Sequence, residues 1–287
     1  MVPIVGVRVN IQLLAVGHCR HCERVTMVGG GLRAITFPSI CALIVHPRAG
    51  PILYDTGYAG HFLNATTTLP ERAYRWLTPV SLPARDELGA QLARRGVALN
   101  DIRWCVLSHF HADHIAGMRD LPAARFIASR QDVEDLRSRS RLGALVKGLL
   151  PTLLPPDFAS RLQYAEALTR RPPAAGWEVL GEGFDLFGDD SVRAVLLPGH
   201  APGHLGLLLR DQQDRRVLLC ADAAWSRRAW QELRLPSLLA RPLFHDWQAY
   251  KRTLHGLHQL AARHGELVIL PSHCQASLDD YRRMQGT

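Results

Sequence analysis

Ser108-His109-Phe110-His111-Ala112-Asp113-His114 is the most informative stretch of the chain. Three imidazoles and one carboxylate fall within six residues, directly after the apolar, strand-like run 104–107. Histidines two positions apart in an extended loop point the same way, and Asp113 and His114, which follow a turn, can face a second point nearby. Imidazole nitrogens and carboxylate oxygens are ligands that suit Zn²⁺, Mn²⁺ or Fe. The motif predicts a metal site, because capping of backbone groups does not account for so dense a cluster.

Three later parts of the sequence repeat this arrangement of an apolar run followed at once by a potential ligand. The ligands are His200 and His204 after residues 192–197, Asp222 after 217–220, and His273 after 267–270. Strands tend to present functional groups just beyond their carboxyl ends, at one edge of a sheet. We therefore expect four strand ends to converge on one binuclear pocket.

The rest of the chain alternates strand-like runs with helices. Strands are expected at 5–9, 12–16, 125–128 and 205–209, and residues 40–45 and 52–54 form a predicted hairpin. Helices are expected at 85–95, 130–137 and 246–263, followed by a last short helix. Interleaved strands and helices in both halves indicate a layered α/β fold. We predict a single domain over residues 1–287, with a helical excursion at about 138–175 in which prolines break any long helix.

Composition limits the classes of protein to consider. The chain has 287 residues, 47% hydrophobic and 21% charged, which excludes a collagen, a coiled coil and a disordered chain. No apolar run reaches the roughly 18–20 residues that span a bilayer. The first residues predict a strand rather than a secretory signal, and the six scattered cysteines fit reduced thiols. We expect a cytoplasmic protein.

Charge gives little evidence for a nucleic-acid partner. The formal net charge is +8, but most of the excess is arginine scattered singly or in pairs such as Arg94-Arg95. No tract of five like charges and no known RNA-binding pattern accompanies it. An arginine-rich, solvated surface is the preferred interpretation.

Taken together, the motifs resemble those of a known family. HFHADH at 109–114, GHAPGH at 199–204, Asp222, His273 and an upstream Asp55-Thr56-Gly57 follow the order typical of the metallo-β-lactamase fold superfamily, over nearly the whole chain. The resemblance implies a four-layer αββα sandwich with a helical insertion and with its site along one edge of two sheets. It also implies two divalent ions, Zn²⁺ ahead of Mn²⁺ or Fe.

The resemblance assigns a role to each ligand. The first metal is expected to bind His109, His111 and His200, and the second to bind Asp113, His114 and His273. Asp222 is expected to bridge both ions, and Asp55 to orient ligands without binding metal.

Hydrolysis is the reaction that such a site implies. Two cations ~3.5–4 Å apart hold a bridging hydroxide near neutral pH, and that hydroxide attacks an ester carbonyl or a phosphoryl centre. Asp113 and Asp222 are the expected catalytic residues, with Asp113 passing a proton to the leaving group. Flavodiiron-type relatives carry Glu in place of His111 and append a flavin domain for which this chain has no room, so oxygen reduction is excluded.

The GHAPGH turn, with its His204, is most similar to the N-acyl-homoserine lactonase and glyoxalase II-like branches. The lactonase branch usually has a Tyr three residues after the bridging aspartate, where this chain has Trp225, whose indole N–H can donate instead. The glyoxalase branch recognises glutathione through a basic C-terminal region, for which the chain after His273 is too short. We therefore expect a lactone such as an N-acyl-homoserine lactone, ahead of an acyl thioester. The alternatives are a phosphodiesterase or ribonuclease, and a ligand-binding regulatory protein without turnover.

The leucine-rich excursion at about 138–175 bears on the substrate. Its apolar side chains predict a cover that accepts an acyl chain, with Leu149, Phe158 and Trp225 as substrate contacts. Packing on the domain's own core, or on a second subunit in a homodimer, is an equal alternative. Membrane-surface contact ranks lower, because basic residues do not mark one clean face in the sequence.

Two further features are set aside. Gly17-His18-Cys19-Arg20-His21-Cys22 looks like a zinc knuckle, but no partner C-x-x-C follows, so a solvent loop near the site rim is expected. Four late histidines are expected to solvate or cap the last long helix: His245, His255, His258 and His264.

Overall fold

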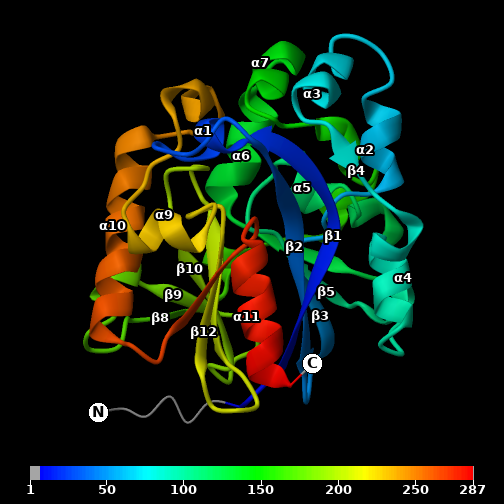
Figure 1. The fold of residues 1–287 in the computed structure, drawn as a ribbon. Coiled ribbons are helices and arrows are strands. Elements are labelled where there is room, and N and C mark those ends of the chain that lie inside the picture. Colours follow the sequence, from blue (N-terminus) through cyan, green and yellow to red (C-terminus); the bar gives the residue numbers. More distant parts are fainter. Residues whose placement is uncertain (1–6, 287) are drawn as a thin grey trace.

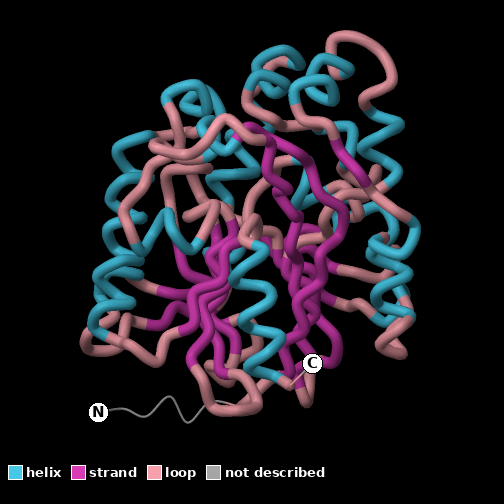
Figure 2. The backbone as a smooth tube through the Cα atoms, viewed as in Figure 1, coloured by secondary structure: helices cyan, strands magenta, loops and turns pink. Residues whose placement is uncertain are grey.

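A computed structural model describes residues 7–286 and confirms the layered α/β class, with two mixed sheets face to face and helices outside them (Figures 1 and 2). The first sheet has seven strands, in the spatial order β4 (Val80–Ser81), β1 (Asn10–Cys22), β2 (Ala34–His46), β3 (Gly50–Tyr54), β5 (Trp104–Val106), β6 (Arg125–Ala128) and β7 (Leu162–Tyr164). The second has six, in the order β13 (Val268–Pro271), β12 (Arg216–Ala221), β11 (Leu205–Arg210), β10 (Val192–Leu196), β9 (Gly183–Asp185) and β8 (Thr169–Arg171).

The helices are mostly short. The α-helices are α1 (Glu23–Thr26), α2 (Gly60–Ala65), α3 (Arg72–Leu77), α4 (Leu88–Ala93), α5 (Ala112–Ile115), α6 (Arg130–Ser138), α7 (Arg141–Val146), α8 (Phe158–Arg161), α9 (Arg227–Gln231), α10 (Trp247–Arg263) and α11 (Gln275–Gln285). The 3₁₀ turns are η1 (Ala84–Asp86), η2 (Leu99–Asp101), η3 (Met118–Asp120), η4 (Pro151–Leu153), η5 (Ala165–Ala167), η6 (Glu178–Leu180) and η7 (Leu238–Leu243). No helix within residues 7–286 is long and apolar enough to cross a membrane.

Three apolar clusters hold the layers together, because both faces of each sheet are covered. On β2, Leu43 packs into the cluster beneath α4 and α5, whereas its neighbours Ala42 and Ile44 face the cluster between the sheets. Strand alternation thus divides one strand between two cores. A third cluster lies between the second sheet and α10, which contributes Leu254 and Leu257.

Strand direction explains where the site lies. β3 and β5 are parallel, and β12 and β13 are parallel. β10 and β12 are each antiparallel to β11, which lies between them, so they share a direction. The carboxyl ends of β10, β12 and β13 therefore meet at one edge of the second sheet, and those of β3 and β5 meet at one edge of the first.

Most predicted elements are confirmed. The hairpin is β2 with β3, in a register that pairs Ala42 with Tyr54. The long late helix is α10, and its N-cap Asp246 accepts hydrogen bonds from the backbone N–H groups of Gln248 and Ala249. The helix predicted at 85–95 is shorter, because the η1 turn precedes α4. Of the strand predicted at 5–9, residues 5 and 6 lie outside the described residues, and Val9 forms a single bridge with Asp211.

The loop predicted at Gly17–Cys22 is wrong, because β1 continues through Cys22. The pairing of β1 with β2 shifts register between Ala15 and His18, and it then resumes with His18 opposite Pro38 and Cys19 opposite Phe37. A β-bulge accommodates the irregularity that Gly17 introduces, so the strand bends without ending. Cys19 is consequently buried.

The excursion at about 138–175 is only partly helical. It contains α7, η4 and α8, and then β7, which pairs with β6 of the first sheet. After η5 it supplies β8, which pairs with β9 of the second sheet. The segment therefore links the two sheets, while the single-domain boundary and the status of this segment as a cover remain predictions.

Candidate metal centre

Four buried side chains from three loops form a first potential ligand group. His109, His111, His200 and Asp222 bring their ligand atoms within 4.8 Å of one another. His200 Nε2 lies 3.2 Å from His109 Nε2 and 3.0 Å from His111 Nδ1. The same nitrogen lies 3.2 Å from Asp222 Oδ2. The loops after β5, β10 and β12 meet as expected from strand direction.

Asp113, His114 and His273 form a second group. His114 Nε2 lies 3.6 Å from Asp113 Oδ2, and His273 Nε2 lies 3.4 Å from the same oxygen. Asp222 reaches this group too, since its Oδ1 is 3.0 Å from His273 Nε2 and 3.4 Å from His114 Nε2. The structure thus brings together all seven predicted metal-binding residues, with Asp222 between the two groups.

Hydrogen bonds on the far side of the rings orient the imidazoles. Asp55 Oδ2 lies 2.7 Å from His114 Nδ1, and Ser108 donates to Asp55 through both its N–H and its hydroxyl, each at 2.8 Å. His273 Nδ1 lies 2.7 Å from the carbonyl oxygen of Pro38. A ring nitrogen that donates outward leaves the other nitrogen with its lone pair toward the centre. Asp55 therefore occupies the orienting position predicted for it.

Two buried atoms at the centre lack hydrogen-bond partners, which tests whether metal ions fit. His114 Nε2 and Asp222 Oδ1, which lie 3.4 Å apart, are both buried and make no hydrogen bond within residues 7–286. Buried polar atoms are normally satisfied. Imidazole nitrogen and carboxylate oxygen are donors that suit divalent first-row metals. The residues present therefore fit metal ions.

Burial and neighbouring charges shift the pKa values of the imidazoles at the centre in opposite directions. Burial, reinforced by the neighbouring imidazoles, holds the pKa values of His109 and His111 well below the usual range. Burial opposes protonation of His114 as well, but the carboxylates of Asp113, Asp55 and Asp222 raise its pKa well above the usual range. Burial also works against ionisation of Asp222, yet His273 and His114 hold its pKa well below the usual value. Asp222 is thus an ionised carboxylate inside the protein.

His204 supports the loop that carries Asp222. Its Nε2 accepts a hydrogen bond of 3.2 Å from the Asp222 backbone N–H, and its ring stacks on His109 with centroids 5.1 Å apart. Burial lowers the pKa of His204 to about 3, so the ring is a neutral acceptor. Gly199 lets this loop approach α10, since it has φ +129° and an added Cβ would lie 2.1 Å from the Tyr250 nitrogen.

The three predicted substrate contacts have different surroundings. Trp225 is buried, and its Nε1–H donates to Asp222 Oδ2 at 2.9 Å, so the indole N–H is committed to that carboxylate. Leu149 lines the pocket next to His111. Phe158 lies in the core, with its ring against Phe110 and Phe126, and is not brought to the pocket.

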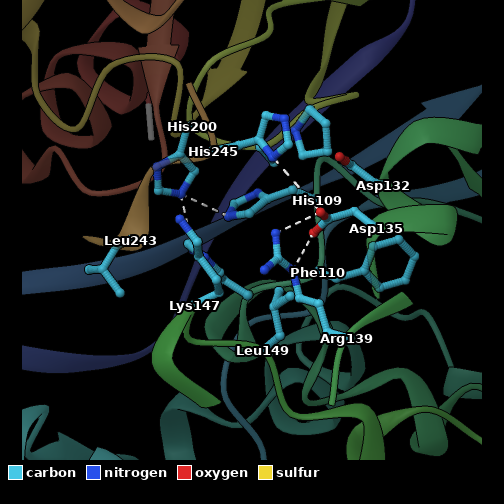
Figure 3. A pocket seen from close by; sticks show the side chains of 13 residues that line it. His109, Phe110, Asp132, Asp135, Arg139, Lys147, Leu149, His200, Leu243 and His245 are labelled. Carbon is cyan, nitrogen blue, oxygen red and sulfur yellow. Dashed lines mark hydrogen bonds and ion pairs between the residues drawn. The ribbon is translucent and has the colours of Figure 1, made fainter. Parts of the chain in front are cut away.

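The pocket beside the first group also contains charged residues that sequence reasoning missed (Figure 3). Asp132, Asp135, Arg139 and Lys147 line it, and His245 lies 3.8 Å from Asp135. His245 was expected only to solvate or cap the late helix. It also forms part of the pocket wall. Arg139 donates to Asp135, which lies one helical turn away, and that i, i+4 spacing was the available signal.

Asp132 is the buried acid of this wall. One of its oxygens accepts a 2.7 Å hydrogen bond from the Gly203 N–H, and the other lacks a partner within the described chain. Burial raises the pKa of Asp132 to about 8.

Comparison with known proteins gives a consistent family. A sequence model described as the Metallo-beta-lactamase superfamily matches residues 35–262. The chain is 29% identical over 234 residues to the N-acyl homoserine lactonase AttM of Azorhizobium caulinodans, an alignment that covers 79% of this chain and 78% of that protein.

Solved structures share the fold. One is an N-acyl homoserine lactone hydrolase with the product N-hexanoyl-L-homoserine at its catalytic metal centre, with a TM-score of 0.71, 18% identity, and coverage of 96% of this chain and 97% of that one. Another is AidC, a dizinc quorum-quenching lactonase, with a TM-score of 0.64, 16% identity, and coverage of 94% and 89%. At these identities the likeness establishes the fold.

Proposed function

The chain belongs to the metallo-β-lactamase superfamily and is a metal-dependent hydrolase, and from that premise we propose that it opens the ring of N-acyl-homoserine lactones. One observation carries the proposal: Asp222 lies between two complete His/Asp groups, each with the donors that a catalytic ion needs. The relative from Azorhizobium caulinodans, a named lactonase, supplies the substrate class.

We assign two zinc ions to the two groups. His109, His111 and His200 would hold the first ion, Asp113, His114 and His273 the second, and Asp222 both. Ions bound there lower the pKa of the water that they bind and polarise an ester carbonyl. Asp55 and Pro38 keep His114 and His273 in position through hydrogen bonds to their outer nitrogens.

Residues around the centre supply the proton transfer and hold Asp222 in position. Water adds to the lactone carbonyl carbon and gives up one proton, the ring C–O bond breaks, and the ring oxygen leaves as an alkoxide that takes up that proton. We assign that proton transfer to Asp113, because its side chain is 12% exposed, against 4% for Asp222, and can reach an incoming substrate. Trp225 fixes Asp222 through its N–H, so only its ring remains for contact with substrate.

We propose that the acyl chain lies in the pocket that reaches the first group. Leu149 and Leu243 give that pocket apolar walls, and Lys147 and Arg139 lie near its polar side. We propose Leu149 as an acyl contact. Phe158 is not proposed as a contact, because its ring packs in the core against Phe110.

The cysteines bear on the compartment in which the protein works. All six cysteines are free, and five of them are buried: Cys19, Cys41, Cys105, Cys220 and Cys274. Free thiols fit a reducing cytoplasm, and we retain that location as a proposal. A homodimer remains a prediction.

Hydrolysis by the zinc-loaded protein tests the function. The substrates are N-hexanoyl- and N-decanoyl-homoserine lactone, an acyl thioester and an activated phosphodiester, with Asp222→Asn as the control. We expect lactone turnover that Asp222→Asn abolishes. Turnover of the thioester or phosphodiester alone would replace the proposal by thioesterase or nuclease activity. If the protein with two ions bound hydrolyses none of the four substrates, the remaining alternative is a ligand-binding protein without turnover.

A further inference from the structure

Most of the exposed large apolar side chains are gathered at one end of the molecule. Twelve such side chains are exposed within the described chain, and nine of them fall in four short segments, 24–33, 69–77, 141–147 and 238–241, which we call the rim. They are Val28, Leu32, Leu69, Trp76, Leu77, Leu142, Val146, Leu238 and Leu239. The helices α1, α3 and α7 and the η7 turn before α10 lie along the same end, at the top of Figure 1.

Direct contacts join the four segments. Ser237, just before η7, donates its N–H to the Val25 carbonyl of α1. Lys147 donates its ammonium to the Phe244 carbonyl just after η7, at 2.7 Å. Arg141 of α7 forms a bidentate ion pair with Glu71, at 2.6 and 2.7 Å. The rim is therefore one continuous surface.

The rim is strongly basic. Its segments contain seven cations, Arg24, Arg33, Arg72, Arg75, Arg141, Lys147 and Arg241, and a single carboxylate, Glu71. Glu71 is taken by Arg141, and Glu23 at the edge lies 3.7 Å from Arg33. The other five cations make no ion pair within residues 7–286. Folding has gathered arginines that look scattered in the sequence.

The rim also lies next to the pocket that reaches the metal centre. Lys147 lines the pocket that contains His109, His111 and His200. A second pocket, lined by Leu238, Arg241 and Trp247, shares Lys147 and His245 with the first. Whatever the rim contacts therefore lies next to the route to the ligands.

We propose that the rim binds an anionic lipid surface, with its apolar side chains inserted among the lipids and its exposed arginines against their head groups. Trp76 is 62% exposed, and the Arg72 guanidinium lies 5.4 Å above its ring, an arrangement that suits the interface between head groups and acyl chains. Cations beside an apolar surface are attracted to anionic lipids.

A second copy of the chain fits this surface less well. A two-fold dimer places the same patch on both sides of the interface, so the four exposed arginines of one copy, Arg24, Arg72, Arg75 and Arg241, would face those of the other. A nucleic acid would satisfy the cations but leave nine apolar side chains exposed to water. An anionic bilayer offers negative head groups to the cations and acyl chains to the apolar side chains. An amphiphilic acyl lactone concentrated in that bilayer would then enter the pocket directly, a consequence that alone rests on the proposed function.

Vesicle co-sedimentation of the zinc-loaded full chain tests the proposal. The vesicles are phosphatidylcholine alone, and phosphatidylcholine with about one part in three of phosphatidylglycerol. Leu77→Ser with Leu239→Ser removes apolar contacts, and Arg75→Gln with Arg241→Gln removes charge. Val179→Ser with Met284→Ser is the matched control, because both side chains are exposed and lie outside the rim.

We expect binding to the anionic vesicles that weakens with salt. Each cation should contribute about fivefold to partitioning, so the double arginine variant should bind about 25-fold more weakly, and the double leucine variant at least tenfold more weakly. The control should bind like the unaltered protein. Hydrolysis of a short-chain, water-soluble lactone should be equal in all four proteins, which separates docking from chemistry.

Two results would overturn the proposal. One is vesicle binding that is absent at low salt, or equal in the rim variants and the control. The other is a protein that binds no vesicles but sediments as a dimer, while its rim variants sediment as monomers. That result would assign the surface to a second copy.

Discussion

Asp55 Oδ2 lies 2.7 Å from His114 Nδ1, and both side chains are buried beneath the metal centre. This contact fixes which nitrogen of His114 faces Asp113 and Asp222. Asp55 itself has φ +62°, a left-handed conformation that Asn adopts as readily. Asp55→Asn is therefore a backbone-compatible variant that weakens the orienting charge.

We expect Asp55→Asn to lower metal affinity by about 10–100-fold, the usual cost of losing an outer hydrogen-bond partner of a ligating histidine. Competition with a chromophoric chelator measures it. Activity should return at high zinc concentration. Unchanged affinity would mean that Asp55 has only a structural role in holding Ser108.

Trp225→Phe should lower kcat/KM by about tenfold while the protein remains folded. The substitution removes the N–H that donates to the ionised Asp222 carboxylate, a bond of the kind worth about 1.5–3 kcal/mol. Trp230→Phe is the control, because the Nε1 atom of Trp230 is buried without a partner. Steady-state kinetics measure kcat/KM for both variants. An equal fall in kcat/KM in the two would contradict the proposed role of Trp225.

Asp132→Asn should stabilise the protein at neutral and alkaline pH. Asp132 has a pKa of about 8 in the folded chain and an ordinary value of 3.8 unfolded, so the folded state holds its proton more tightly. Stability from this group is present below pH 4 and is lost as pH rises toward 8. Asn keeps an acceptor for the Gly203 N–H.

Urea unfolding at several pH values measures the effect of Asp132→Asn. The free energy of unfolding of the variant should exceed that of the unaltered protein by about 1–3 kcal/mol at pH 8. This difference should shrink toward pH 4. A difference that is constant with pH would place the effect outside the ionisation of Asp132.

Removal of metal should lower the melting temperature by several degrees. Ligands bound only to the folded state add about 2.7 kcal/mol at a concentration one hundred times their dissociation constant. Calorimetry with and without a chelator checks this, and zinc should restore the transition. Asp222→Ala should show a smaller shift, since its two ligand groups lose their shared carboxylate. Equal shifts in the two proteins would argue against Asp222 as a common ligand.

The metal ligands could be predicted because each follows an apolar strand within a few residues. Chain direction alone then sends His200, Asp222 and His273 to one edge. The double hydrogen bond from Ser108 to Asp55, by contrast, joins residues 53 apart in sequence and was not predicted. The family resemblance implied only that Asp55 orients ligands.

Long-range packing decided what the sequence could not reveal. Gly17 suggested a loop, but pairing with β2 and β4 carries β1 past it as a bulge. Trp225 was expected to face substrate, and its N–H instead meets Asp222. The cations of the rim come from four separate segments, so no sequence window contains them together.

Zinc titration of the metal-free protein, with N-decanoyl-homoserine lactone hydrolysis as the readout, tests the central claim most directly. The account predicts that activity rises until two ions are bound per chain, and that the product is the open acyl-homoserine, one water heavier than the lactone. Ring opening that is complete with one ion, or absent at every metal loading, would contradict it.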